Sequence, residues 1–152
     1  MEILKTYEMM NKLPQGKLIF SKAVCLRAPY FASIAPRVRD LRVGQCEITM
    51  KKRRSVTNHI NTVHAIAMCN LAELCAGLCI DASLPKSKRW IPKGMSVKYL
   101  AKAETDLVGT CAMDPAGIVD GDNDLDVVVK NTAGTDVFSA RITMYVSNKR
   151  SN

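Results

Sequence analysis

The chain has 152 residues, of which 47% are hydrophobic and 24% charged, and its formal net charge is +8. These values are ordinary for a soluble globular protein, and the length predicts one domain over residues 1–152. With 5% aromatic residues and no helix-turn-helix or zinc pattern, the positive charge does not indicate a nucleic-acid-binding protein.

Residues 1–28 are predicted to form an N-terminal helical segment. Residues 2–13 have the pattern of a short amphipathic helix, and residues 16–28 fit helix or strand, with helix favoured. The early Glu2 and the scattered lysines exclude a signal peptide, because no apolar run follows them. Six cysteines in a chain without an export signal then predict reduced thiols and a cytoplasmic protein.

Two strands are predicted next in the chain. Residues 31–41 have the composition of a strand, and Pro36 places that strand at an edge or a bulge of its sheet. Residues 43–53 begin with a turn and then alternate between apolar and polar side chains, which is typical of a half-buried strand. Residues 54–63 are predicted to be a loop.

Residues 64–82 are predicted to form one long helix, because Ala, Leu, Met, Ile and Cys dominate and no proline interrupts them. The segment is apolar nearly all round, so the helix should be buried on most sides. Asn70 and Glu73 interrupt it, which argues against a membrane span. Glu73 is then a carboxylate in a core helix, where only a partner or a reaction accounts for it. We expect four side chains to be substantially buried: Met68, Leu71, Leu74 and Leu78.

The start of this helix is a second candidate for chemistry. Asn61 and Thr62 can cap it, which leaves backbone N–H groups near His64 and Ala65 that suit an anion or a developing oxyanion. Glu73 lies nine residues after His64, about 13.5 Å along the axis and roughly half a turn around it. One helix cannot bring both groups to one small ligand. The spacing therefore predicts a homodimer with antiparallel helices and two shared sites.

Four further strands are predicted after Pro85, at residues 95–101, 107–113, 125–130 and 137–146. The predicted fold class is therefore α+β, with five or six antiparallel strands around one long helix.

No metal site is predicted. Three of the six cysteines lie in the long helix and none forms a Cys-x-x-Cys pair, so small core side chains are the better interpretation. The acidic segment 120–126 lacks the glycine and glutamate of a calcium-binding loop, because Leu125 and Asn131 occupy those positions. We interpret this segment as a solvated hairpin loop.

Asn58, His64 and Glu73 are separated by five and eight residues, and this spacing resembles the motif of hotdog-fold acyl-CoA thioesterases, in particular the phenylacetyl-CoA thioesterase-like branch. The sequence segments NHINTVHAIAMCNLAE and RWIPKGMSVKYLAKA are similar to those of an uncharacterised subgroup of that superfamily. The resemblance covers residues 29–146 and is strongest over residues 58–103. It implies a hotdog fold, in which a sheet wraps around the central helix.

The resemblance also implies an activity, the hydrolysis of a thioester between an acyl group and coenzyme A or a related pantetheine carrier. Asn58 would orient the thioester or the water, His64 and Ala65 would supply the helix N-terminus, and Glu73 would be general base or nucleophile. No cofactor is implied beyond the coenzyme A of the substrate. The sequence departs from the motif where Ala65 and Ile66 replace two glycines, and where Pro92 stands in place of a polar residue.

The two basic runs, residues 51–54 and 86–89, have two interpretations. They can be solvated surface, or they can contact the phosphates of coenzyme A at the mouth of the site. On the second interpretation the substrate-binding residues are Arg53, Arg54, Lys88 and Arg89.

Structural alternatives stay open for each candidate residue. His64 can be a hydrogen-bonded structural histidine, Asn58 a turn residue and Glu73 a buried structural acid. The whole chain can also be a non-catalytic acyl-CoA or lipid-carrier binding protein on the same fold. A hotdog dehydratase or hydratase is less favoured, because its Asp and His pair is not apparent and Asp81 is late on the helix. Whether dimers pair into tetramers is left open.

Overall fold

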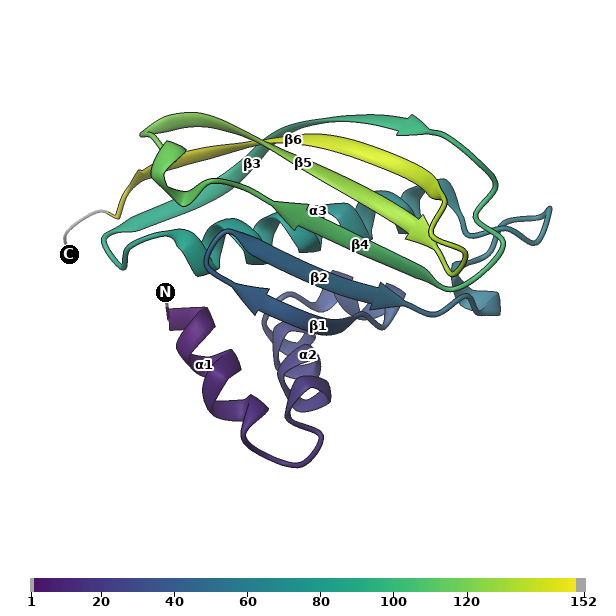
Figure 1. The fold of residues 1–152 in the computed structure, drawn as a ribbon, viewed down its shortest axis with the longest axis horizontal. Coiled ribbons are helices and arrows are strands. Elements are labelled where there is room, and N and C mark those ends of the chain that lie inside the picture. The colour runs from purple at the N-terminus through teal and green to yellow at the C-terminus, as the bar shows by residue number, and fades with distance from the viewer. Residues whose placement is uncertain (1, 150–152) are drawn as a thin grey trace.

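A single sheet of six strands wraps around one long helix (Figure 1). The computed structural model describes residues 2–149. Neighbouring strands are antiparallel throughout, in the order β1-β2-β4-β5-β6-β3. The strands are β1 (Arg37–Arg42), β2 (Gln45–Met50), β3 (Lys88–Tyr99), β4 (Leu107–Ala112), β5 (Gly121–Asn131) and β6 (Asp136–Asn148). The helices are α1 (Glu2–Asn11), α2 (Gly16–Arg27) and α3 (Ala65–Ser83), with short 3₁₀ turns η1 (Pro29–Ile34), η2 (Arg54–Val56) and η3 (Pro115–Gly117).

Helix α3 forms the centre of the hydrophobic core. The prediction for its burial is confirmed, because Met68, Leu71, Leu74 and Leu78 are all less than a tenth exposed. Although α3 is long and apolar enough to cross a membrane, 67% of its most apolar window is buried inside the protein, as in the core helix of a soluble protein. The predicted α+β architecture is therefore confirmed.

Small residues let the helix lie close to the sheet. A Cβ atom on Gly109 of β4 would lie 3.2 Å from Leu71 Cγ, so glycine leaves room for that side chain. Cys46, Cys75, Cys79 and Cys111 are buried at the same interface. The Cys75 thiol donates to the Cys46 carbonyl at 3.4 Å, and a side-chain hydrogen bond with Cys46, together with burial, raises the pKa of Cys75 well above the usual value. These cysteines act as small core side chains, as predicted.

The N-terminal segment folds as two helices beside β1 and α3, as predicted from its sequence (Figure 1). Tyr7 of α1 and Phe20 of α2 pack edge to face, with their ring centroids 5.0 Å apart. The Ser21 hydroxyl accepts a hydrogen bond of 2.9 Å from the Val38 N–H, which ties α2 to the edge of the sheet. Both helices are thus fixed to the body of the fold.

The prediction of a strand over residues 31–41 was wrong in its first half. Pro29–Ile34 is a 3₁₀ turn, and the strand starts only at Arg37. The turn has Pro29 at its first position, and Ala35 ends it with a left-handed φ of 44°. The later strand predicted over residues 95–101 starts earlier, at Lys88, and ends at Tyr99.

The interpretation of residues 120–126 as a hairpin loop was also wrong, because β5 begins at Gly121. Leu125 is buried while Asp124 and Asp126 on either side of it are exposed, which is strand alternation. Strand β6 supplies partners for both carboxylates, with Thr143 Oγ1 2.6 Å from Asp124 and Arg141 Nε 2.8 Å from Asp126. The Arg141 guanidinium lowers the pKa of Asp126.

The two edges of the sheet differ. Strand β1 has six residues, its pairing with β2 is interrupted by a bulge between Val38 and Asp40, and α2 packs against it. Strand β3 has twelve residues and is paired on one side only, with β6. Its exposed side chains include Ile91 and Tyr99, which are 62% and 54% exposed.

Replacing Leu71 by Ala should lower the free energy of unfolding by roughly 2–5 kcal/mol, because a buried leucine leaves a cavity between α3 and β4. The same change at Leu26, which is 83% exposed, should alter it by less than about 0.5 kcal/mol. Urea denaturation of both variants measures the difference. Equal losses would contradict the central position of α3.

Candidate active site

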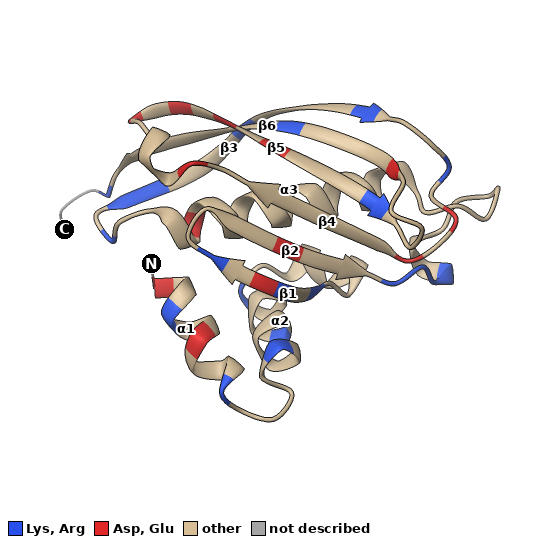
Figure 2. Ribbon diagram, in the orientation of Figure 1, with Lys and Arg blue, Asp and Glu red and all other residues tan. Residues whose placement is uncertain are grey.

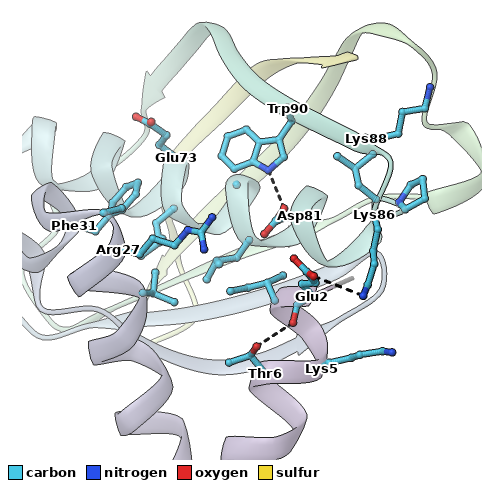
Figure 3. Close-up of a pocket in the computed structure, with 18 of the residues that line it drawn as sticks. Glu2, Lys5, Thr6, Arg27, Phe31, Glu73, Asp81, Lys86, Lys88 and Trp90 are labelled. Carbon is cyan, nitrogen blue, oxygen red and sulfur yellow. Dashed lines mark hydrogen bonds and ion pairs between the residues drawn. The ribbon is translucent and has the colours of Figure 1, made fainter. Parts of the chain in front are cut away.

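A cavity of about 750 Å³ opens between α1, α2, α3 and the start of β3 (Figure 3). Its volume lies in the range of small-molecule sites, roughly 300–1,000 Å³. Apolar side chains on its wall include Ile3, Met9, Val24, Phe31, Leu74, Leu78, Leu84 and Trp90. The charged side chains on its wall are Glu2, Lys5, Arg27, Glu73, Asp81, Lys86, Lys88 and Lys149.

Glu73 lies on the wall of this cavity, in the middle of α3. Its side chain is half-buried, because the cavity leaves that side of α3 uncovered. Asn70, one turn earlier, donates from Nδ2 to Ser33 Oγ at 3.0 Å and does not bond to Glu73. Within residues 2–149, no hydrogen bond or ion pair holds the Glu73 carboxylate. It is therefore available to a ligand.

Trp90 of β3 forms the neighbouring wall (Figure 3). Its indole Nε1 donates to Asp81 Oδ1 at 3.3 Å. A Cβ atom on Gly77 would lie 2.8 Å from Trp90 Cη2, so only glycine at this position lets the ring lie against α3. The Trp90 side chain is half-buried, at the rim of the cavity.

Lys86 and Lys88 lie at the far end of the cavity from Glu73 (Figure 3). Lys86 Nζ lies 3.6 Å from Glu2 Oε1, and both side chains are more than 60% exposed. Lys88 Nζ lies 2.6 Å from Asp120 Oδ1. Arg27 projects from α2 between these groups and Phe31 in the view of Figure 3. The polar groups thus lie mainly at the rim.

The N-terminus of α3 is capped by His64. The His64 N–H donates to the Val56 carbonyl at 2.8 Å, which fixes the entry of the chain into the helix. His64 Nδ1 accepts from the Ile66 N–H at 3.1 Å. Among the described residues, no group accepts a hydrogen bond from the Ala65 N–H. This N–H therefore points out of the first turn with its hydrogen-bonding capacity unused.

The side chain of Asn58 holds the loop before α3. Its Oδ1 accepts from the backbone N–H groups of Ile60 and Thr62, at 3.2 and 3.0 Å, and its Nδ2 donates to Thr62 Oγ1 at 2.8 Å. Asn61, in the same loop, has a left-handed φ of 59°, which asparagine tolerates. Asn58 therefore has the bonding of a turn residue.

The structure does not bring the predicted site residues together within one chain. Asn58, His64 and Ala65 lie at the N-terminus of α3, whereas Glu73 faces the cavity about 13 Å further along the helix.

The predicted basic residues are divided in the same way (Figure 2). Arg53 and Arg54 precede and begin η2, near the start of α3, and Arg53 Nη2 donates to the Ser33 carbonyl at 2.8 Å. Lys88 and Arg89 lie at the start of β3, after the end of α3, and Arg89 Nε donates to Ser147 Oγ at 3.3 Å.

Sequence reasoning missed the contribution of the N-terminal helices to the cavity. Met9 and Arg27 belong to segments assigned only a structural role, and no local motif distinguishes them. Within residues 2–149, no cluster of three His, Cys, Asp or Glu side chains is placed to hold a metal ion.

A profile of the DUF4442 family, described as a domain of unknown function, matches residues 16–146. The chain belongs to this family. A structural-genomics crystal structure, APC5556, is 44% identical with a TM-score of 0.87, and the match covers 98% of this chain and 100% of the other. A comparison with curated proteins gave no significant match.

Two more distant structures share the fold of this DUF4442 chain, which agrees with the hotdog fold that the resemblance implied. PA5026 of Pseudomonas aeruginosa, a protein of unknown function described as a probable thioesterase, is 18% identical with a TM-score of 0.79 and covers 90% of this chain and 97% of its own. The thioesterase HI1161 of Haemophilus influenzae is 13% identical with a TM-score of 0.76, and the match covers 86% of this chain and 90% of the other. At these identities the likeness concerns the fold.

Replacing Gly77 by Ala should displace the Trp90 ring, because the added methyl group would lie 2.8 Å from it. Trp90 is the single tryptophan of the chain, so its fluorescence emission should shift towards that of an exposed indole. Gly117→Ala is the matched control, since nothing lies within 4 Å of a Cβ there. Unchanged emission in both variants would show that the ring does not lie against α3 in solution.

Proposed function

We propose that this protein hydrolyses acyl-CoA thioesters at two equivalent sites, each shared between the subunits of a homodimer. The observation that carries the proposal is the unpartnered Glu73 carboxylate on the wall of a cavity, in a hotdog fold whose central helix also offers the Ala65 N–H. A carboxylate without a structural partner suits proton transfer. Solved relatives described as thioesterases have the same fold, and this supports the reaction class.

A second copy of the chain would complete the site. One rigid helix holds Glu73 and Ala65 too far apart to contact the same carbonyl group. The long edge strand β3 is unpaired on one side, and α3 exposes 55% of Ile66. An unpaired edge and an exposed apolar side chain both favour association. If two β3 strands pair antiparallel, α3 of each subunit lies beside α3 of the other.

In this arrangement the Ala65 N–H would hold the thioester oxygen as it gains negative charge. Glu73 of the partner subunit would take a proton from water while the water oxygen attacks the carbonyl carbon. The carbon–sulfur bond then breaks, the sulfur of coenzyme A leaves as a thiol after protonation, and the acyl group leaves as a carboxylate. Attack by the carboxylate itself, through an anhydride that water opens, gives the same products.

Other residues have supporting roles in the proposal. We assign Asn58 to positioning, because its side chain holds the loop before α3. Arg53 and Arg54 of one subunit would share a mouth with Lys88 and Arg89 of the partner subunit and attract the phosphates of coenzyme A. The reaction requires no cofactor beyond the coenzyme A of the substrate, and the buried thiols suit a reducing cytoplasm.

Changing Glu73 to Gln should lower turnover by at least roughly a hundredfold while acyl-CoA binding is kept, because size and most hydrogen bonding are retained. Release of coenzyme A thiol measures turnover, and equilibrium dialysis measures binding. Glu47→Gln is the matched control, since Glu47 is also half-exposed but lies on the outer face of β2. Equal activity in wild type and Glu73→Gln would reject the role of Glu73.

Changing Ala65 to Pro should remove the oxyanion donor without breaking α3, because proline is favoured at the first helical position and His64 already has extended dihedrals, with ψ at 139°. The loss should be roughly a hundred- to a thousandfold. Remixing this variant with Glu73→Gln should restore about a quarter of wild-type activity, because half of the dimers are mixed and each has one intact site. No recovery in verified heterodimers would contradict the shared site, and so would sedimentation as a monomer.

The second candidate function is acyl-CoA binding without hydrolysis. The contact that favours it is the hydrogen bond from the Ile66 N–H to His64, which leaves one backbone donor fewer for an oxyanion. The bulk of Ile66 at the helix start also limits close approach of a carbonyl. Tight binding of acyl-CoA with no thiol release by wild type, across all chain lengths, would select this function.

A further inference from the structure

We infer that the cavity between α1, α2, α3 and the start of β3 holds an unbranched apolar acyl chain of medium length, and that α1 sets the length of chain accepted. The inference deepens the proposed function and rests on it in one respect, which is that the thioester carbonyl lies at Glu73. It assigns a substrate class to the site and a specificity-determining role to the N-terminal helix.

The wall chemistry fits a hydrocarbon chain. The apolar part of the wall includes Leu74, Gly77 and Leu78 of α3, the Trp90 ring, and Ile3 and Val24 from the N-terminal helices. Two of the polar side chains on the wall have partners, since Asp81 accepts from Trp90 and Lys88 bonds to Asp120, whereas Arg27 projects into the cavity beside Phe31 (Figure 3) with no partner among the described residues. Each methylene group buried against the apolar part of the wall strengthens binding of the acyl chain, whereas a polar acyl chain would lose hydrogen bonds to water there.

The length of the cavity fits a chain of medium length. Its wall follows α3 from Glu73 to Leu84, a distance of about 16 Å at the rise of an α-helix. With carbon–carbon bonds of about 1.5 Å in an extended zigzag, this distance accommodates roughly twelve carbons. Figure 3 shows the same order, with Glu73 and Phe31 at one end, Trp90 and Asp81 in the middle, and Glu2 and Lys86 at the other end.

Helix α1 supplies the wall opposite α3, and its bulk determines the space available. Met9 lines the cavity and is 62% exposed, so a larger side chain there extends into free volume rather than into the packed core. The other side of α1 is anchored, because Tyr7 is buried against Phe20 and donates to the Arg39 carbonyl at 3.2 Å. The helix can therefore act as a fixed wall.

The first test is a series of saturated acyl-CoA substrates of about four to about sixteen carbons. For wild type, kcat/KM should rise roughly two- to fourfold per methylene up to about twelve carbons and then level off or fall. Met9→Tyr should move the optimum to shorter chains and lower kcat/KM for the longest by roughly tenfold. Leu13→Tyr, the control, changes a residue that is 55% exposed and outside the cavity, and should leave the profile unchanged.

A flat profile, or the same shift in both variants, would overturn the inference while leaving hydrolysis intact.

The second test measures binding without catalysis. Trp90 is the single tryptophan, so saturated fatty acids of about twelve carbons that carry bromine at mid-chain should quench its fluorescence by contact. Quenching should be weaker for bromine at the terminal carbon, weaker in Met9→Tyr, and unchanged in Leu13→Tyr. Quenching of this kind in a protein that hydrolyses no thioester would uphold the chain site and reject the hydrolase. Absence of quenching by any brominated chain would reject the site, whatever the hydrolytic activity.

Discussion

Helix α3 carries apolar side chains on nearly every side, and an open sheet can cover only some of them. The six strands curve around the helix and bury Leu71, Cys75 and their neighbours against β2 and β4. The 3₁₀ turn η1 and helix α1 cover part of what remains. Where this cover is incomplete, the structure has the cavity beside Glu73 and the exposed Ile66 at the helix start. The candidate site is thus located where a core helix lacks cover.

The rigidity of the same helix constrains the chemistry. A helix fixes the separation of its residues, so Glu73 and Ala65 cannot approach each other by any local rearrangement. Catalysis of the kind proposed then depends on assembly, and loss of the second subunit would remove half of each site. The N-terminal helices add a further element, because they form part of the wall of the cavity that Glu73 lines.

Much of the fold could be predicted from sequence because its signals are local. The apolar run after His64 predicts α3 within one residue at each end, and period-two alternation predicts β2 and the second half of β3. The errors come from distant partners. The aspartates after Asp120 have turn composition, but Arg141 and Thr143 of β6 pair with two of them and make a strand of the segment. Residues 31–34 fit a strand by composition, yet Ala35 with positive φ ends a turn there.

The candidate site was predictable only in part. The spacing of His64 and Glu73 along one helix follows from sequence, because helical geometry converts residue number into distance. The cavity does not follow from it. Ile3, Val24 and Trp90 meet only because α1 and α2 pack beside α3, and no local pattern contains that information. Asn58 is the opposite case. Its hydrogen bonds are those of a turn residue, which its residue type made foreseeable, whereas its spacing from His64 suggested a catalytic role that these contacts do not indicate.

The unequal edges of the sheet bear on solubility. Strand β1 is short, bulged and backed by α2, and it carries Arg37, Arg39 and Arg42, so it is a poor template for a further strand. Strand β3 is interrupted by a bulge at Pro92, which has no N–H to donate, so pairing along its free edge is confined to the segments on either side. A sheet that can extend only at its β3 edge stops growing once one further sheet has paired there through its own β3 edge. The geometry of the two edges therefore disfavours open-ended fibre formation.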